Sequence, residues 1–317
     1  MKEEMMKAVL YYKKGSPEKL IYCDVKKPVP NENEVLIKIF SASVNAADYR
    51  SMKMGIIPKR GIFGADIAGI IESVGQNIRE FNPGDEVIGN LSGFGFGGFA
   101  EYTTAPERAL IMKPVEISFD EAAAFPMAGV TALQALRDKG NIQKGKKVLI
   151  IGVGGGVGTF ALQLAKYFGA EVTGVCSTKN IKNINSLSVD FVIDYTKKDF
   201  TKSDRRYDII IAVNGNYPLS SCKRILNSNG VYVMVGGALI QIFKSMLFGW
   251  LLSFGSKKIR SLTSKSNHND LEFIANLVKD KKIAPIIDRR YPLEKTAEAI
   301  NYLADGHAQG KVIIIVR

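Results

Sequence analysis

The sequence has few of the residues that build disulfide or metal frameworks. Its 317 residues include three cysteines and two histidines, and no Cys-x-x-Cys pair occurs. Because Cys23, Cys176 and Cys222 lie far apart, neither a disulfide framework nor a structural zinc lobe is expected. We expect reduced thiols, as in a cytoplasmic protein. With only His268 and His307 in the chain, we expect no histidine-rich metal site.

The sequence also lacks a long run of one charge. Its 43 basic and 31 acidic residues give a net charge of +12, but the lysines are scattered in twos and threes. No aromatic-plus-arginine ribonucleoprotein motif accompanies them. We therefore interpret the charge as dispersed and solvated, and we expect no nucleic-acid partner.

No apolar run has the length of a membrane-spanning helix. The most apolar stretch, residues 238–255, contains Gln241, Lys244 and Gly249 and is short for such a helix. We interpret it as a helical hairpin or lid, buried against a partner or over a substrate cleft, with contact to a membrane surface as the alternative. The first residues show no charged-then-apolar leader, so we expect a cytoplasmic protein.

Short β-like runs fill the first third of the chain. They lie at residues 35–40, 69–74 and 86–89, and the turn Pro83-Gly84-Asp85 precedes the last of them. The pattern predicts a barrel-like antiparallel domain and not a strand–helix–strand unit.

A helical segment follows at residues 118–136. Ser118 is a candidate N-cap, and Glu121, three residues later, completes a capping box. Pro126 and Gly129 interrupt the segment, which predicts two helices in place of one.

From Gly145 onward the pattern changes to continuous apolar runs. A run without polar alternation is typical of a parallel strand buried on both faces. Since such runs alternate with helical segments, they predict an α/β fold with a doubly wound parallel sheet. The runs lie at residues 148–151, 171–176, 191–193, 208–213 and 230–235. The last part of the chain predicts helices at 270–279 and 293–303 and strands at 286–288 and 311–316.

A glycine-rich run is the strongest single motif. Residues 152–158 read Gly-Val-Gly-Gly-Gly-Val-Gly, directly after a predicted strand and at the start of a predicted helix. Such a run lets the backbone approach a pyrophosphate and present helix N-terminal amides to it. A strict Gly-x-Gly-x-x-Gly ending at Gly158 fails, because Val153 stands at its first position. The alternative is a glycine-rich turn without a ligand.

The residues after the second parallel run bear on the choice of nucleotide. A fold that prefers NAD usually places a carboxylate about twenty residues past the glycines, to bind the ribose hydroxyls. This sequence has Ser177, Thr178 and Lys179 there. No carboxylate repels a 2′-phosphate, and two hydroxyls and an ammonium can bind one, so we expect NADPH rather than NADH. For Lys179 an ordinary exposed loop lysine is the alternative.

Together these motifs resemble the medium-chain dehydrogenase/reductase superfamily, in its zinc-free quinone oxidoreductase-like branch. The matching segments are residues 43–50, 64–69, 83–87, 98–102, 128–132 and 306–312, besides the glycine run. The resemblance implies a GroES-like β-barrel-type catalytic domain formed by residues 1–127 and 269–317. It implies a doubly wound parallel-sheet (Rossmann) NADP-binding domain at residues 128–268, inserted between them. It also implies a homodimer that pairs through edge strands of the cofactor-domain sheets.

The resemblance also shows what is missing. Zinc-dependent members carry a catalytic cysteine where Asn45 or its neighbour stands here, and a Gly-His-Glu motif where this chain has Gly64-Ala65-Asp66. Zinc needs three or four such ligands. We therefore expect no metal.

For catalysis the resemblance implies Asn45, Asp48 and Tyr49, near the nicotinamide. Tyr49 is a candidate hydrogen-bond or proton donor to the oxygen of the reduced substrate. A packed aromatic residue is the alternative for Tyr49, and a structural hydrogen-bonding role is the alternative for Asp48.

For cofactor binding the resemblance implies a set of residues spread over several strand ends. They are Thr131, Gly155, Gly156, Val157, Gly158, Ser177, Lys179, Tyr195, Asn214, Gly236 and Lys311. Gly155 to Gly158 would form the pyrophosphate turn, and Ser177, Lys179 and Tyr195 the 2′-phosphate end. Lys311 is either a contact to cofactor phosphate or a surface lysine.

We therefore expect an NADPH-dependent oxidoreductase that transfers hydride, without zinc, to a small electrophile such as a quinone or an α,β-unsaturated carbonyl compound. The alternative is a weakly catalytic or noncatalytic NADPH-binding redox sensor or scaffold protein, because a fold alone does not prove chemistry.

Overall fold

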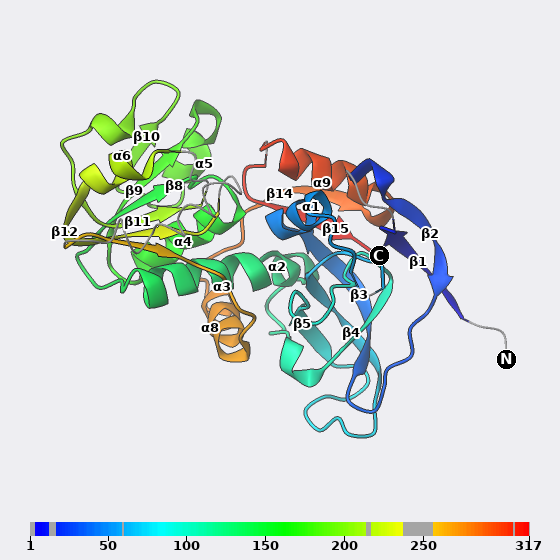
Figure 1. The fold of residues 1–317 in the computed structure, drawn as a ribbon. Helices are drawn as coiled ribbons and strands as arrows, with labels where there is room; N and C mark the ends of the chain where they lie inside the picture. The colour runs from blue at the N-terminus through cyan, green and yellow to red at the C-terminus, as the bar shows by residue number, and fades with distance from the viewer. Residues whose placement is uncertain are drawn as a thin grey trace. The chain divides into compact units, whose positions relative to one another are not determined.

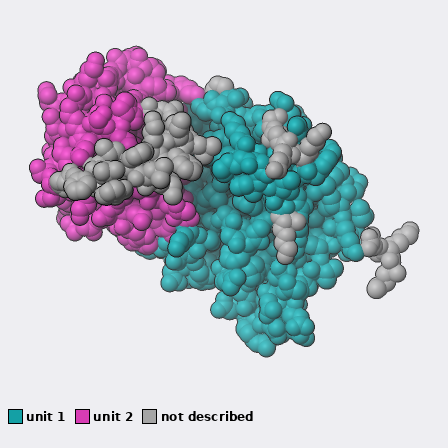
Figure 2. Space-filling view, in the orientation of Figure 1, with its two compact units in different colours: residues 1–130, 265–317 teal, residues 131–264 magenta. Residues whose placement is uncertain are grey.

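The structure of the protein is a computed structural model, which describes residues 4–12, 17–58, 60–213, 217–236, 256–306 and 308–316. It divides into two compact units, residues 1–130 with 265–317 and residues 131–264 (Figure 2). The predictions for Asn214, His307 and segment 238–255 concern residues outside these ranges.

Unit 1 is built on a largely antiparallel sheet. Its strand order is β14-β15-β3-β4-β5-β7, with β6 paired to β3, and β14 and β15 are the one parallel pair. The strands are β3 (Val35–Val44), β4 (Asp66–Val74), β5 (Glu86–Asn90), β6 (Tyr102–Ala105), β7 (Leu110–Met112), β14 (Ile287–Pro292) and β15 (Lys311–Ile315). The hairpin β1 (Met5–Leu10) and β2 (Ile21–Lys26) forms a second, two-stranded sheet. The prediction of an antiparallel first domain is confirmed.

The end of the chain returns to this sheet. Strand β15 pairs antiparallel with β3, and Val312 lies opposite Val44. Helix α9 (Thr296–Ala304) contributes Ala299 and Ile300 to the same hydrophobic core as β3 and β4. The last fifty residues therefore belong to unit 1, which also contains helices α1 (Ala46–Lys53) and α8 (His268–Lys279).

The segment 118–136 forms two helices, α2 (Phe119–Ala124) and α3 (Pro126–Gln134), and a π-helical stretch, Ala135–Lys139, continues α3. Ser118 and Glu121 form the predicted capping box, with the Ser118 backbone N–H donating to Glu121 at 3.0 Å. Pro126 starts α3, where its missing N–H costs no helical hydrogen bond. The predicted break at Gly129 is wrong. A Cβ there would lie 2.9 Å from Ile274 of α8, so this glycine permits close helix packing.

Unit 2 contains a six-stranded parallel sheet (Figure 1). Its order is β10-β9-β8-β11-β12-β13, so the chain runs outward from β8 on one side and resumes at β11 on the other. Ligands of such sheets bind beyond the carboxyl ends of the strands at this switch point. The strands are β8 (Lys147–Ile151), β9 (Glu171–Cys176), β10 (Phe191–Asp194), β11 (Tyr207–Ala212), β12 (Leu226–Met234) and β13 (Lys258–Ser261). The helices are α4 (Gly156–Tyr167), α5 (Ile181–Asn185) and α6 (Leu219–Arg224).

The apolar runs on the central strands of unit 2 are buried as predicted, but the run at 191–193 on the terminal strand β10 is not, since Phe191 is 43% exposed. Val148, Leu149 and Ile150 of β8 are fully buried, because α4 and the other covering elements leave neither face of the central strands in water. The doubly wound sheet is thereby confirmed. None of the helices in the described ranges is long and apolar enough to span a bilayer.

The pairing of β3 with β4 generates a stability prediction. A Cβ at Gly69 would overlap the carbonyl oxygen of Lys38 on the neighbouring strand, whereas a Cβ at Gly93 would meet no atom within 4 Å. We expect Gly69→Ala to lower the free energy of unfolding by about 3 kcal/mol, because the strands must separate locally. Gly93→Ala is the matched control and should leave it within about 0.5 kcal/mol. Urea denaturation measures both, and equal midpoints would contradict the assigned strand contact.

Candidate functional site

The glycine run forms a tight turn between β8 and α4. Gly152 has a φ of +83°, a conformation that favours glycine, and the Gly155 N–H donates to the Gly152 carbonyl at 3.3 Å. A Cβ at Gly158 would overlap that same carbonyl oxygen. The first turn of α4 therefore packs directly against the backbone at the end of β8.

This turn is suited to an anion. Helix α4 begins at Gly156, and its first turn carries no acidic residue. The first backbone N–H groups of a helix have no acceptor within it, and together they carry partial positive charge. The predicted pyrophosphate residues, Gly155, Gly156, Val157 and Gly158, are the residues of this turn.

The ends of β9 and β10 bring the predicted 2′-phosphate residues together. Cys176 and Asp194 are register partners at these ends, and the Tyr195 N–H donates to the Cys176 carbonyl at 3.0 Å. Ser177 follows directly after β9, and Lys179 lies in the short 3-10 helix Thr178–Asn180. The Tyr195 side chain is 50% exposed. Hydroxyl and ammonium groups are thus gathered at one edge of the sheet.

Sequence reasoning missed a carboxylate at this edge. Asp194 accepts hydrogen bonds from the Thr178 hydroxyl at 2.5 Å and the Thr196 hydroxyl at 2.7 Å. These bonds hold the pKa of Asp194 below its usual value, so it is charged at neutral pH. The sequence signal for this acid lies at the end of the third parallel run, residues 191–193, which Asp194 directly follows. Because neighbouring parallel strands end at the same edge of a sheet, an acid there lies beside the end of the second run.

Asn180 was also missed. A Cβ on Gly154 would lie 2.7 Å from the Asn180 amide nitrogen, so this side chain packs against the glycine turn. The same amide nitrogen donates to the Ser177 hydroxyl at 3.4 Å. Asn180 therefore links the glycine turn to the Ser177 loop, a contact that no local sequence pattern signals.

The other predicted cofactor residues of unit 2 are more scattered. Gly236 follows β12, and its N–H donates to the Ala212 carbonyl at the end of β11 at 3.2 Å. It lies at the same carboxyl edge as the glycine turn. Thr131 is buried on α3 and is not one of these strand-end residues.

In unit 1, Asp48 is a fully buried carboxyl group. It accepts the backbone N–H of Asn45, which precedes α1, at 2.7 Å, and that of Gly64 at 3.3 Å. Burial, with the nearby charge of Asp66, raises the pKa of Asp48 to about 7, although these two donors and Lys311 oppose the rise. The geometry matches the structural alternative for Asp48, which holds the start of α1 against residue 64.

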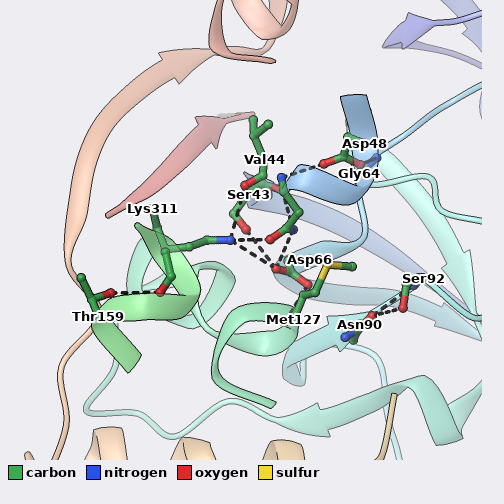
Figure 3. Close-up of polar contacts among 12 residues, drawn as sticks. Ser43, Val44, Asp48, Gly64, Asp66, Asn90, Ser92, Met127, Thr159 and Lys311 are labelled. Atoms are coloured by element: carbon green, nitrogen blue, oxygen red, sulfur yellow. Dashed lines mark hydrogen bonds and ion pairs between the residues drawn. The ribbon is translucent and has the colours of Figure 1, made fainter. Parts of the chain in front are cut away.

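Beside Asp48 lies a buried cluster that we call the Lys311 cluster: Ser43, Asn45, Asp66 and Lys311 (Figure 3). The Lys311 ammonium donates to the Asn45 side-chain oxygen at 2.6 Å and lies 3.7 Å from Asp66. Asp66 also accepts from the Asn45 amide nitrogen at 2.9 Å, the Ser43 hydroxyl at 3.1 Å and the Met127 N–H at 3.0 Å.

Of the two predictions for Lys311, the one that makes it a surface lysine is wrong. Its residue exposure is 3% and that of Asp66 is 0%, because β15 pairs with β3 beneath the covering helices. Burial lowers the pKa of Lys311 and raises that of Asp66, and the attraction between the two charges opposes both shifts. Asp66 was noted in the sequence only as a departure from a metal-binding motif.

Tyr49 lies on α1 and is half-buried. Its ring packs against the core of unit 1, and the Arg50 guanidinium and Lys53 ammonium lie 5.8 and 5.6 Å from the ring centre. The packed-aromatic alternative thus describes its ring. The role of its hydroxyl as a donor stays a prediction.

The Lys311 cluster does not suit a divalent metal. Neither Asn45 nor Ala65, the neighbour of Asp66, supplies a thiolate or imidazole ligand, and the Asp66 carboxylate already faces the Lys311 ammonium. Within the ranges that the structure describes, no three His, Cys, Asp or Glu side chains gather as metal ligands would.

Two family models match the chain. The model for an alcohol dehydrogenase GroES-like domain matches residues 31–115, and the model for a zinc-binding dehydrogenase matches residues 187–314.

Individual proteins match along nearly the whole chain. A chloroplast envelope quinone oxidoreductase homolog of Arabidopsis thaliana is 34% identical over 319 residues, 95% of each chain. An NADPH-dependent alkenal/one oxidoreductase of the same plant is 29% identical, covering 98% of this chain and 79% of its own. The solved structure of a quinone oxidoreductase from Coxiella burnetii superimposes with a TM-score of 0.90 at 29% identity, covering 99% of this chain and all of the other.

The raised pKa of Asp48 generates a pH prediction. The folded carboxyl holds its proton up to about pH 7, whereas the unfolded one releases it near 3.8. The contribution of this proton to stability is therefore complete below pH 3.8 and is lost as the pH rises to about 7. We expect Asp48→Asn to remove this pH-dependent loss of stability. The free energy of unfolding of the variant, taken relative to wild type, should therefore rise between pH 3.8 and about 7.

Urea denaturation at pH 5, 6, 7 and 8 measures the difference. Asp204→Asn, at an exposed position in unit 2, is the control and should give a curve parallel to wild type. A parallel curve for Asp48→Asn as well would show that Asp48 is ionised throughout.

Proposed function

Because the chain belongs to the medium-chain dehydrogenase/reductase superfamily, in its quinone oxidoreductase-like branch, we propose that it is an NADPH-dependent, zinc-independent reductase of quinones and α,β-unsaturated carbonyl compounds. The chain is an oxidoreductase with the pyridine-nucleotide-binding fold of that family. The observation that carries the proposal is the glycine turn at 152–158, set at the switch point of the unit 2 sheet.

The residues of unit 2 fit such a nucleotide. The overlap that a Cβ at Gly158 would cause supports a turn shaped for close backbone approach, and the uncharged first turn of α4 supports a pyrophosphate there. We propose that Gly155, Gly156, Val157 and Gly158 hold the pyrophosphate. Thr131, Gly236 and Asn214 are proposed for the nicotinamide half, Asn214 on sequence alone.

The choice of NADPH over NADH is part of the proposal. Ser177, Lys179 and Tyr195 converge at one sheet edge and offer hydroxyl and ammonium donors to a 2′-phosphate. The name of the alkenal/one oxidoreductase relative supports the same nucleotide. Asp194 opposes it electrostatically, but its oxygens are bonded to Thr178 and Thr196.

When bound, the nicotinamide supplies the hydride. We propose that unit 1 supplies the residues of the substrate site, with Asn45 and Tyr49 in contact with the substrate and Asp48 positioning them. Asp48 fixes the start of α1, Asn45 presents an amide, and the Tyr49 hydroxyl donates to the substrate oxygen. Quinones and enones accept hydride without strong polarisation, which suits a site in which the Lys311 ammonium is buried and bonded to Asn45.

Several wider expectations belong to this proposal. Residues 1–127 with 269–317 are proposed as the catalytic domain and residues 128–268 as the NADP-binding domain. A homodimer is proposed to pair through edge strands of the unit 2 sheets, whose terminal strands in the described order are β10 and β13. The three cysteines are free, which supports work in a reducing, cytoplasm-like compartment.

A nucleotide-binding prediction tests the 2′-phosphate end. We expect Lys179→Gln to weaken NADPH binding about 10-fold, and Tyr195→Phe to weaken it less, because each removes one donor to the phosphate. Binding of NADH should stay within about two-fold. Fluorescence titration of the bound nucleotide measures both. Lys202→Gln, the same charge change at another exposed lysine of unit 2, is the control. Equal losses for NADPH and NADH would refute the assignment.

The activity itself is tested by NADPH oxidation with 1,4-benzoquinone, a simple enone and an aldehyde, with and without a chelator. We expect turnover with the quinone or the enone, unchanged by the chelator. Tight NADPH binding without any turnover would instead support a redox sensor or scaffold. Loss of turnover on chelation would refute the zinc-independent part of the proposal.

A further inference from the structure

The Asn45 side chain has only one chemically allowed orientation. Its amide lies between Lys311, which can only donate, and Asp66, which as a carboxylate can only accept. The side-chain oxygen therefore faces Lys311 at 2.6 Å, and the amide nitrogen faces Asp66 at 2.9 Å. A flipped amide would set oxygen against carboxylate and N–H against ammonium.

Burial makes this orientation strict. The exposures of Asn45, Asp66 and Lys311 are 6%, 0% and 3%, so water does not stand in for a lost partner. Asp66 is held in turn by the Ser43 hydroxyl and the Met127 N–H (Figure 3). Asp66, which orients the Asn45 amide, is therefore itself held in place.

Both amide hydrogens of Asn45 have partners, but one of them is held weakly and can be transferred to a stronger acceptor. One amide hydrogen serves Asp66, and the other meets the Ser43 carbonyl at 3.4 Å, close to the limit for such a bond. The oxygen is engaged by a full positive charge, which also strengthens the amide N–H as a donor. An amide held in this way is suited to the carbonyl oxygen of a quinone or an enone.

We propose that Lys311 is a positioning residue, which locks the Asn45 amide so that it presents its N–H to the carbonyl oxygen of the substrate. This rests on the proposed function, in which Asn45 acts on the substrate. It assigns Lys311 a role different from contact with cofactor phosphate, and it explains why a buried ammonium is kept although its burial is unfavourable.

The experiment uses full-length Lys311→Met, Lys311→Arg and, as a matched control, Lys113→Met. Lys113 is another buried lysine of unit 1, 7% exposed, and it bonds the Ile117 carbonyl at 2.6 Å and Glu86 at 2.8 Å, away from Asn45. Measured are kcat and KM for the enone, the Kd for NADPH, and the urea midpoint, with kcat scaled to the folded fraction.

We expect Lys311→Met to lower kcat about 10- to 100-fold, as the loss of an orienting partner does, with the Kd for NADPH within about two-fold. Lys311→Arg should recover most of kcat, because it keeps a charged donor. Lys113→Met should lower the urea midpoint and leave kcat unchanged. A loss of kcat in Lys311→Met no larger than in Lys113→Met would overturn the proposal. A raised Kd for NADPH with unchanged kcat would do so too, in favour of the phosphate contact.

A measurement without turnover separates this proposal from the proposed function. The side-chain amide signal of Asn45 in a ¹⁵N–¹H NMR spectrum is assigned by its loss in Asn45→Ser. We expect Lys311→Met to shift or broaden that signal and Lys311→Arg to restore it, even if wild type reduces no electrophile. An unchanged signal in Lys311→Met would overturn the positioning role. If Lys311→Met does not fold, the double variant Asp66→Asn with Lys311→Met removes both charges and is compared with Asp66→Asn alone, because Asp66 also bonds the Asn45 amide. An unchanged signal between these two variants would overturn the positioning role.

Discussion

The burial of Lys311 against Asp66 is the constraint on which the arrangement of unit 1 depends. Two charges removed from water are unfavourable by several kcal/mol unless their remaining capacity is filled. Strand β3 supplies Ser43, the residue before α1 supplies Asn45, and α3 supplies the Met127 N–H. Elements from the start, the middle and the end of the chain must therefore meet at one place.

In unit 2 the shape of the glycine turn is set by the backbone, with almost no contribution from side chains. The turn at 152–158 needs glycine at two positions. A Cβ at Gly158 would overlap the backbone, and Gly152 has a backbone conformation that favours glycine. Side-chain chemistry enters only at the edge formed by β9 and β10, where Asp194 and Thr178 order the loop that carries Lys179. Unit 2 therefore combines a turn set by backbone geometry with an edge set by side-chain hydrogen bonds.

Much of the fold could be predicted from the sequence because its signals are local. The apolar runs of unit 2, the capping box at Ser118 and Glu121, and the proline that starts α3 depend on neighbours along the chain. The break at Gly129 failed because that glycine serves a contact with Ile274, over a hundred residues away. For the same reason Asp194, Asn180 and the pairing of Lys311 with Asp66 were not predicted. Each depends on which strand ends adjoin, and that is settled by tertiary packing.

The return of β15 to β3 has a consequence for how the chain folds during synthesis. All of residues 131–264 leave the ribosome before the strand that completes the unit 1 sheet. Until Lys311 to Ile315 arrive, one side of β3 near Val44 has no strand partner, and Asp66 has no cation. An unpaired strand edge of this kind is prone to pair with other chains. A nascent chain therefore carries this open strand edge until residues 311–315 are made, and a chain cut before Lys311 would keep the edge open permanently.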